Sequence, residues 1–178
     1  SAYALPKGLY VQALCLVIPG KDAKSLPVTT EGWGGAEKFV TATHNLNSFQ
    51  TAPEWSDKEK ELHPHADPHS IVAIQLFALD AIYTPSKKHD KPGTVRDRKT
   101  GKALTLGAQQ CLAWTLLPLF DKSYVLSGTH HLPLFEGEMP TSVLKAVESQ
   151  LVENVFHDTP DIQRNRMAGA ALVVDLWD

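Results

Sequence analysis

Two apolar segments joined by a short polar turn occupy residues 108–137, and they constrain the fold more than any other part of the chain. The letters run AQQCLAWTLLPLF and then DKSYVLSGTHHLPLFEG. Pro118 stops helix propagation after the first segment, and Pro133 is tolerated within a strand only at a sheet edge or at a bulge. We therefore expect two neighbouring antiparallel strands near the edge of a β-sheet.

The first of these segments has one bulky apolar face. Leu112, Trp114 and Leu116 alternate along it, and alternate residues of a strand point to the same side of the sheet. We expect this face, with Trp114 at its middle, to pack against a second sheet.

Three further segments have the composition of buried strands: residues 9–18, 70–79 and 168–177, with the letters LYVQALCLVI, SIVAIQLFAL and AGAALVVDLW. The second is apolar on both faces apart from Gln75, and the third is also strongly apolar. Strands covered on both faces have this character, so both are expected to be central in a sheet.

Polar stretches separate these segments. A shorter strand with alternating polarity is expected at residues 38–43. Residues 45–67 are polar and punctuated by prolines, which indicates a solvated connection with a short candidate strand at 48–51. Residues 81–107 have no period and several structure breakers, so we expect a long exposed loop.

One helix is expected late in the chain. Val143, Leu144, Val147 and Leu151 follow helical spacing after Pro140. Thr141 or Ser142 is the expected N-cap, since a hydroxyl oxygen accepts a hydrogen bond from an unpaired amide at a helix start. The residues from 157 to 167 are expected to form a polar linker.

Length and charge exclude several classes of protein. The chain has 178 residues, a formal net charge of −3 and a pI near 6.2. This balance gives no reason to expect a nucleic-acid partner, because nucleic-acid binders carry an excess of basic charge.

Cys15 and Cys111 each lie in apolar runs, which favours two buried reduced thiols over a single buried disulfide. Without a transmembrane-length apolar run or a signal-like N-terminus, an intracellular protein is expected.

The order of the apolar segments resembles a C2 domain. The resemblance rests on GLYVQALCLVIPG, IVAIQLFALD followed by a long loop, LAWTLLPLF, LPLFEG and ALVVDLW. LAWTLLPLF, followed by Tyr124, Ser127-Gly128 and LPLF, is similar to C2 domains of ciliary and cytoskeletal coiled-coil proteins. The resemblance spans most of the chain. It implies an all-β fold, an antiparallel eight-stranded C2-like β-sandwich with long loops and one short late helix, as a single domain over residues 1–178.

The same resemblance gives an expectation about calcium. C2 domains that bind calcium gather several carboxylates at one end of the sandwich, because a hard divalent cation needs several oxygen ligands. In this chain Asp22 is the only acidic residue in the first loop before Glu31, and the central strand ends Ala78-Leu79-Asp80, so Ala78 stands where a second carboxylate is required. Even with Asp90 nearby, we expect a calcium-independent domain without metal or cofactor.

Neither the histidines nor any motif indicates catalysis. His63, His65 and His69 surround Asp67, but Pro64 and Pro68 hold this segment extended, which favours solvated histidines over a metal site. The chain has no GxSxG, GxxxxGK[ST], GxGxxG or HExxH motif. A hydrolase using Ser127, His130 or His131 and Asp121 is kept as a second alternative, since a triad is defined by geometry.

The strongest functional feature is a run of positive charge between residues 87 and 102, here named the basic segment. Its cations outnumber Asp90 and Asp97 in a chain that is acidic overall. The candidate residues for binding an anionic partner are Lys87, Lys88, Lys91, Arg96, Arg98, Lys99 and Lys102. No aromatic residues interleave these charges, which argues against single-stranded nucleic acid.

By the C2 resemblance, the basic segment emerges at the end of the sandwich that many C2 domains turn toward anionic membranes. Acidic protein tails such as those of tubulin offer the same charge. We therefore expect a non-catalytic interaction or scaffolding module of a larger cytoskeletal or ciliary protein, located in the cytoplasm, cytoskeleton or cilium. A peripheral membrane-targeting C2 domain is the first alternative, and a solubilising insertion without a partner is the plainest interpretation of the segment.

Overall fold

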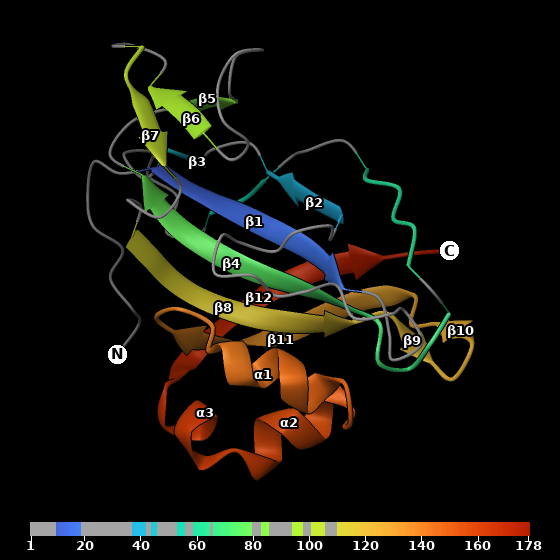
Figure 1. The fold of residues 1–178 in the computed structure, drawn as a ribbon. Helices are drawn as coiled ribbons and strands as arrows, with labels where there is room; N and C mark the ends of the chain where they lie inside the picture. The colour runs from blue at the N-terminus through green and yellow to red at the C-terminus, as the bar shows by residue number, and fades with distance from the viewer. Residues whose placement is uncertain are drawn as a thin grey trace.

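The computed structural model describes the second half of the chain almost continuously and the first half in separate segments (Figure 1). The described residues are 10–18, 37–41, 44–45, 53–55, 59–64, 66–79, 83–85, 94–97, 101–105 and 110–178. The candidate strand at 48–51 lies outside them. None of the helices within these ranges is long and apolar enough to span a membrane.

Seven strands form one sheet in which every pair is antiparallel, with the order β12-β11-β8-β4-β1-β2 and with β3 also beside β1. Its strands are β1 (Tyr10–Ile18), β2 (Glu37–Val40), β3 (His44–Asn45), β4 (Ile71–Leu79), β8 (Gln110–Pro118), β11 (Gly128–Glu136) and β12 (Arg166–Leu176). The expected central position of β4 is confirmed, because it lies between β1 and β8. Its β-branched and aliphatic side chains are buried on both faces, as in sheets that are covered on both sides.

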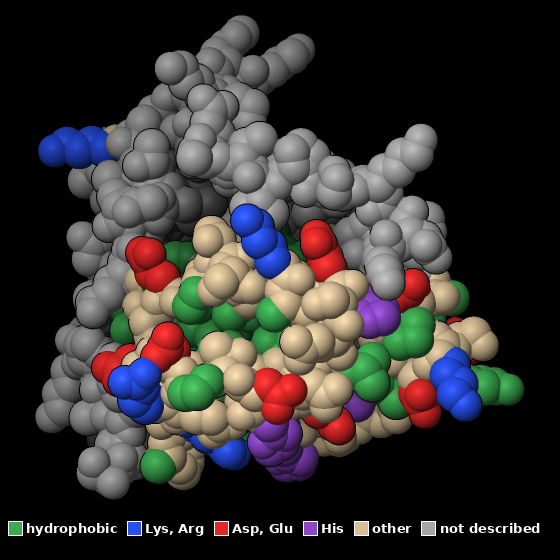
Figure 2. Space-filling view, turned by 60° about the horizontal axis from the view of Figure 1, so that its bottom comes forward, with side chains coloured by type: hydrophobic (Ala, Val, Ile, Leu, Met, Phe, Trp, Pro, Cys, Tyr) green, Lys and Arg blue, Asp and Glu red, His purple; other side chains and the backbone are tan. Residues whose placement is uncertain are grey.

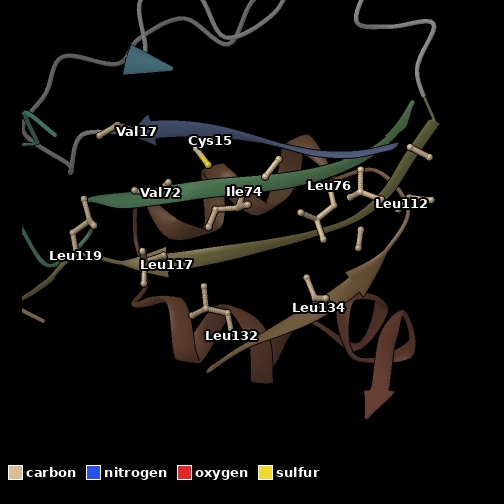
Figure 3. Packing of buried hydrophobic residues seen from close by; sticks show 14 residues of the cluster. Cys15, Val17, Val72, Ile74, Leu76, Leu112, Leu117, Leu119, Leu132 and Leu134 are labelled. Atoms are coloured by element: carbon tan, nitrogen blue, oxygen red, sulfur yellow. The ribbon is translucent and has the colours of Figure 1, made fainter. Parts of the chain in front are cut away.

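The sheet bends sharply between β8 and β11. These two strands share only the pairs Phe135↔Trp114 and Glu136↔Ala113, whereas β11 pairs with β12 along most of its length. Leu132 and Leu134 of β11 point into the same core as the side chains of β1, β4 and β8 (Figure 3). The β11–β12 half of the sheet therefore lies over one face of the other half, which makes the fold all-β and sandwich-like, as expected.

The other face of the sheet is covered by helices: α1 (Thr141–Val147), α2 (Val152–Asp158) and α3 (Pro160–Arg164). They lie against the β8 side of the sheet (Figure 1) and bury Val143, Val147, Val155 and Ile162 there. The expectation of one helix followed by a polar linker is therefore wrong. These helices are only seven, seven and five residues long, so each shows too little periodicity to be distinguished from a loop.

The expected N-cap of the first helix is also wrong. Pro140 occupies that position, and no side chain caps the helix. Val143, Leu144 and Val147 are buried as predicted, but Leu151 is 49% exposed because α1 has ended and Leu151 instead precedes α2.

Trp114 is buried as expected, but its partners differ from the expected facing sheet. It is 2% exposed, stacks on Phe135 at 4.8 Å between ring centroids, and lies in the core beneath the helices. Leu112 instead points into the opposite core. A register shift opposite Leu76 and Phe77 inserts an extra residue into β8, and such a bulge reverses the face on which the following side chains lie.

The last two strands have the opposite places in the sheet from those expected. The apolar strand β12, expected to be central, forms an edge of the sheet, and β11 lies inside it. The register of β11 shifts between Pro133 and Phe135, and this irregularity accommodates the proline. The expectation that Pro133 lies at a sheet edge or at a bulge is therefore confirmed. Met167, Leu172 and Val174 pack partly against the core, while the alternate positions of β12 are exposed.

Thr115 is expected to destabilise the core through its hydroxyl group. It is completely buried opposite Ile74, and its Oγ1 has no hydrogen-bond partner among the described residues. Because an unsatisfied buried hydroxyl costs about 1–3 kcal/mol, Thr115→Val is expected to raise the free energy of unfolding by about 1 kcal/mol in urea denaturation. Thr115→Ser, which keeps the hydroxyl and loses a methyl group, should lower it by a similar amount. A clear loss of stability in Thr115→Val would show that the hydroxyl is satisfied.

Candidate functional site

Three short strands cross the segment that was expected to be a structureless loop. β5 (Tyr83–Pro85), β6 (Thr94–Asp97) and β7 (Ala103–Thr105) form a separate antiparallel sheet with β6 at its centre. The expectation of a long irregular loop over residues 81–107 is thus corrected. Each strand has only three or four residues, of which half are β-branched or aromatic, so their alternation was too brief to recognise in the sequence.

The three-stranded sheet carries part of the predicted anion-binding set. Arg96 lies on β6, and Lys102 is exposed just before β7. The other candidates lie outside the described residues: Lys87, Lys88, Lys91, Arg98 and Lys99. The sheet lies beyond one end of the main sheet, where β4 ends and β8 begins (Figure 1). Arg96 and Lys102 are therefore placed beside a sheet that is separate from the main sheet.

A groove of about 640 Å³ lies at the other end of β8. It is formed by residues 59–64, by the hairpin of β9 (Phe120–Asp121) and β10 (Tyr124–Val125), and by the end of β12 with the residues that follow. Its apolar lining consists of Leu62, Pro64, Leu119, Phe120, Val125, Leu176 and Trp177. Leu119 is 2% exposed at its base, whereas Trp177 is 59% exposed, so a tryptophan ring is presented to solvent beside an apolar floor.

Carboxylates surround this apolar floor. Glu59, Glu61, Asp175 and Asp178 line the groove with one cation, Lys60, so its charged side chains sum to −3. All five are exposed. We name this feature the acidic groove. Its negative charge lies at the end of β8 away from the sheet that carries Arg96.

Three contacts tie Trp55 and residues 59–64 to the main sheet. The indole Nε1 of Trp55 donates a hydrogen bond of 3.2 Å to the carbonyl oxygen of Val11 in β1. The ammonium of Lys60 lies 6.0 Å from the centre of the Phe39 ring, a cation–π geometry, and Leu62 packs against the core. The expectation that residues 45–67 form a solvated connection is therefore wrong for Trp55 and Leu62, which pack against the core, whereas Glu59, Lys60, Glu61 and His63 are exposed, as expected.

The acidic groove was not predicted from the sequence. Its residues come from three segments that are distant along the chain, and the run DKEKEL has the composition of an ordinary solvated surface. The one available signal was Trp177, an aromatic residue that directly follows a strand. The helical face shows no comparable segregation of charge, because acidic and basic side chains are interspersed there (Figure 2).

The histidine-rich segment makes a local contact. Asp67 Oδ1 accepts hydrogen bonds from the backbone N–H of His69 at 2.7 Å and lies 3.0 Å from His69 Nδ1. His63 is exposed, and His65 lies outside the described residues. Within the part of the chain that the structure describes, no three His, Cys, Asp or Glu side chains gather as metal ligands. Asp22, Glu31, Asp80 and Asp90 also lie outside that part.

The residues nominated for nucleophilic chemistry do not contact one another. His130 Nε2 donates to the carbonyl oxygen of Leu126 at 2.6 Å, and His131, Ser127 and Asp121 are exposed. Among the described residues no hydrogen bond joins Ser127, His130 and Asp121. A serine nucleophile needs a base within hydrogen-bond reach, and these side chains do not supply it.

Cys15 and Cys111 are reduced thiols, as expected; Cys15 is buried as predicted, whereas Cys111 is only half-buried. Burial raises the pKa of the Cys111 thiol to about 11, the negative charge of Glu138 adds to this, and a backbone hydrogen bond at Ala113 opposes it. Its Sγ lies 3.4 Å from the carbonyl oxygen of Gly137, which the thiol reaches as a donor. A protonated thiol is a weak nucleophile, so Cys111 is suited to packing and not to covalent catalysis.

The raised pKa of Cys111 predicts slow alkylation. The ordinary thiol pKa of 9.0 is raised to about 11, so at pH 8 Cys111 should hold about a hundredfold less thiolate than an unperturbed cysteine. Its rate with iodoacetamide, followed by peptide mass spectrometry, should keep rising up to about pH 11. Cys111→Ala provides the background, and a plateau near pH 9 would contradict the prediction.

Compared with protein-family models, with curated proteins and with solved structures, the chain gives no match.

Proposed function

We propose that this chain is a non-catalytic, C2-like interaction or scaffolding module of a larger cytoskeletal or ciliary protein, acting inside the cell. The proposal rests on one observation above all: Arg96 and Lys102 of the basic segment lie on β6 and just before β7, in a small sheet that is separate from the main sheet. Seven cations and two aspartates lie between residues 87 and 102, in a chain whose net charge is −3. Such a local excess attracts an anionic partner although the whole protein is acidic.

The partner we propose is an acidic protein segment, such as a glutamate-rich cytoskeletal tail. Several positive charges on a short segment raise the encounter rate with a negative chain and need no fixed geometry on the partner. The C2 resemblance supports the cytoskeletal or ciliary setting. The unconnected Ser127, His130 and Asp121 and the protonated Cys111 support a non-catalytic module.

The test uses a fluorescein-labelled glutamate-rich peptide and two proteins. One is the parent, and the other is a neutralised variant in which Lys87, Lys88, Lys91, Arg96, Arg98, Lys99 and Lys102 are replaced by glutamine. We expect the parent to bind in fluorescence anisotropy and the neutralised variant to lose most of the affinity, with an unchanged circular dichroism spectrum. Equal binding by the two proteins would overturn the proposal.

Anionic membrane is the alternative partner, and no nucleic acid is proposed. Each basic residue near an anionic bilayer contributes about 1 kcal/mol, so the same segment would serve a membrane-targeting domain. Co-sedimentation with anionic and neutral vesicles distinguishes the two partners. Preferential binding to anionic vesicles, with weak binding to the acidic peptide, would favour the membrane.

Calcium is not expected to stabilise the domain. Ala78, where a calcium-binding C2 domain requires a carboxylate, is a buried core residue in β4. Melting temperatures in calcium and in a chelator should therefore agree. A bound ion at a hundred times its dissociation constant would add about 2.7 kcal/mol, so a clear rise in calcium would contradict this.

A further inference from the structure

We propose that the acidic groove and the adjoining edge of β12 bind a cationic peptide of a partner protein in an extended conformation. This is a second site, and it does not depend on what the basic segment binds. Two features of the structure lead to it: the charge of the groove and the unpaired edge of the strand beside it.

The charge of the groove selects a cationic occupant. Four exposed carboxylates and one ammonium line it, and that ammonium is already placed over the ring of Phe39. Asp175 is further held by Thr129, whose Oγ1 donates to Asp175 Oδ1 at 2.7 Å. An acidic or neutral peptide would leave these carboxylates without a counter-charge, whereas arginine or lysine side chains would supply one.

The edge of β12 selects an extended backbone. β12 pairs with β11, and none of the described strands pairs with its outer N–H and C=O groups, so this edge offers them to an added strand. Its regular part pairs Ala171 to Leu176 with Pro133 to Gly128, and this part ends at the groove. Peptides commonly bind by adding a strand to such an edge.

The two faces of β12 predict the pattern of the peptide. Successive side chains of an added strand would point to opposite sides of the sheet. One set would meet the apolar floor near Leu176, and the other would meet the outer face, where Val173 is 56% and Trp177 is 59% exposed. A guanidinium over the exposed Trp177 ring would add a cation–π contact. Alternating basic and aliphatic residues fit this surface.

The experiment titrates the whole chain with three fluorescein-labelled peptides: alternating arginine and valine, alternating glutamate and valine, and alternating arginine and serine. We expect the arginine–valine peptide to bind most tightly and the glutamate–valine peptide not to bind. In a groove variant with Glu59→Gln, Glu61→Gln, Asp175→Asn and Asp178→Asn, the affinity should fall by about tenfold or more.

A matched variant controls for net charge. Glu136→Gln, Glu148→Gln, Glu153→Gln and Asp158→Asn remove four exposed carboxylates outside the groove and should leave the affinity within about twofold of the parent. Equal losses in the two variants would mean that overall charge alone attracts the peptide, and the site would be rejected.

Hydrogen exchange tests the added strand separately. When the arginine–valine peptide saturates the parent, amide exchange should slow in residues 171–176 and in the peptide, with no such change in β2 at the other end of the strand order. Binding without protection of β12 would overturn the strand addition, and no binding by any peptide would overturn the whole proposal. If the parent self-associates and the groove variant does not, the occupant is a second copy of this chain and the proposed partner is wrong.

Discussion

Replacing Trp114 with alanine is expected to lower the free energy of unfolding by about 3 to 5 kcal/mol in chemical denaturation. The indole is 2% exposed and packs between β8 and the helices, where it stacks on Phe135. Its loss removes a large apolar surface and leaves a cavity that backbone hydrogen bonds on both sides of β8 prevent from collapsing.

Trp177→Ala is the matched control for this substitution. Trp177 is 59% exposed at the edge of the acidic groove, so its removal should change the free energy of unfolding by less than about 0.5 kcal/mol. If Trp114→Ala and Trp177→Ala unfold at the same denaturant concentration, the packing of the helical layer against the sheet is not as described.

Replacing Phe135 with alanine should be similarly costly, about 3 to 5 kcal/mol, because its ring joins the sheet to the helices. It is 1% exposed, 4.8 Å from the Trp114 ring and 4.9 Å from the Phe156 ring between centroids. It also stands in one of the two residue pairs that connect β8 with β11.

The double variant of Trp114 and Phe135 tests their contact directly. Aromatic pairs contribute about 0.5–1.5 kcal/mol beyond the area they bury, so the combined loss should be smaller than the sum of the two single losses. Equilibrium denaturation of all four proteins gives this coupling energy. Strictly additive losses would mean that the two rings do not interact.

The long buried strands could be predicted from the sequence, whereas their order could not. β1 and β4 were recognisable because runs such as YVQALCLVI and IVAIQLFAL bury side chains on both faces. β12 has the same apolar composition, yet Val173 on its outer face is 56% exposed. Composition alone does not distinguish a strand with two neighbours from an edge strand with an exposed apolar face.

The short helices and the acidic groove could not be predicted from sequence patterns. The helices have Pro140, Leu151 and Thr159 at their N-cap positions, and none of these side chains makes a capping hydrogen bond, so the strongest start signal is missing. The basic segment was found because its charges are contiguous. The acidic groove brings Glu61 and Asp175 together only through the bend of the sheet and the contacts of Trp55 and Lys60.

The sheet that carries Arg96 lies where β8 begins, and the acidic groove lies where β8 ends (Figure 1). The strands that carry the basic segment precede β8, and the hairpin that lines the acidic groove follows it. This separation would let one domain hold an acidic and a basic segment at the same time, as a scaffold does. It also makes the two sites separately testable, because glutamine substitutions at one end leave the other unchanged.

The salt dependence of binding to the glutamate-rich peptide tests the proposed function most directly. Screening shortens the Debye length from ~10 Å at 0.1 M to ~3 Å at 1 M, so an electrostatic contact made by the seven cations of the basic segment should weaken steeply over this range. We expect the parent to lose affinity continuously with salt and the neutralised variant to bind weakly at every salt concentration. Affinity that is unchanged by salt, or that is retained by the neutralised variant, would contradict a binding role for the basic segment.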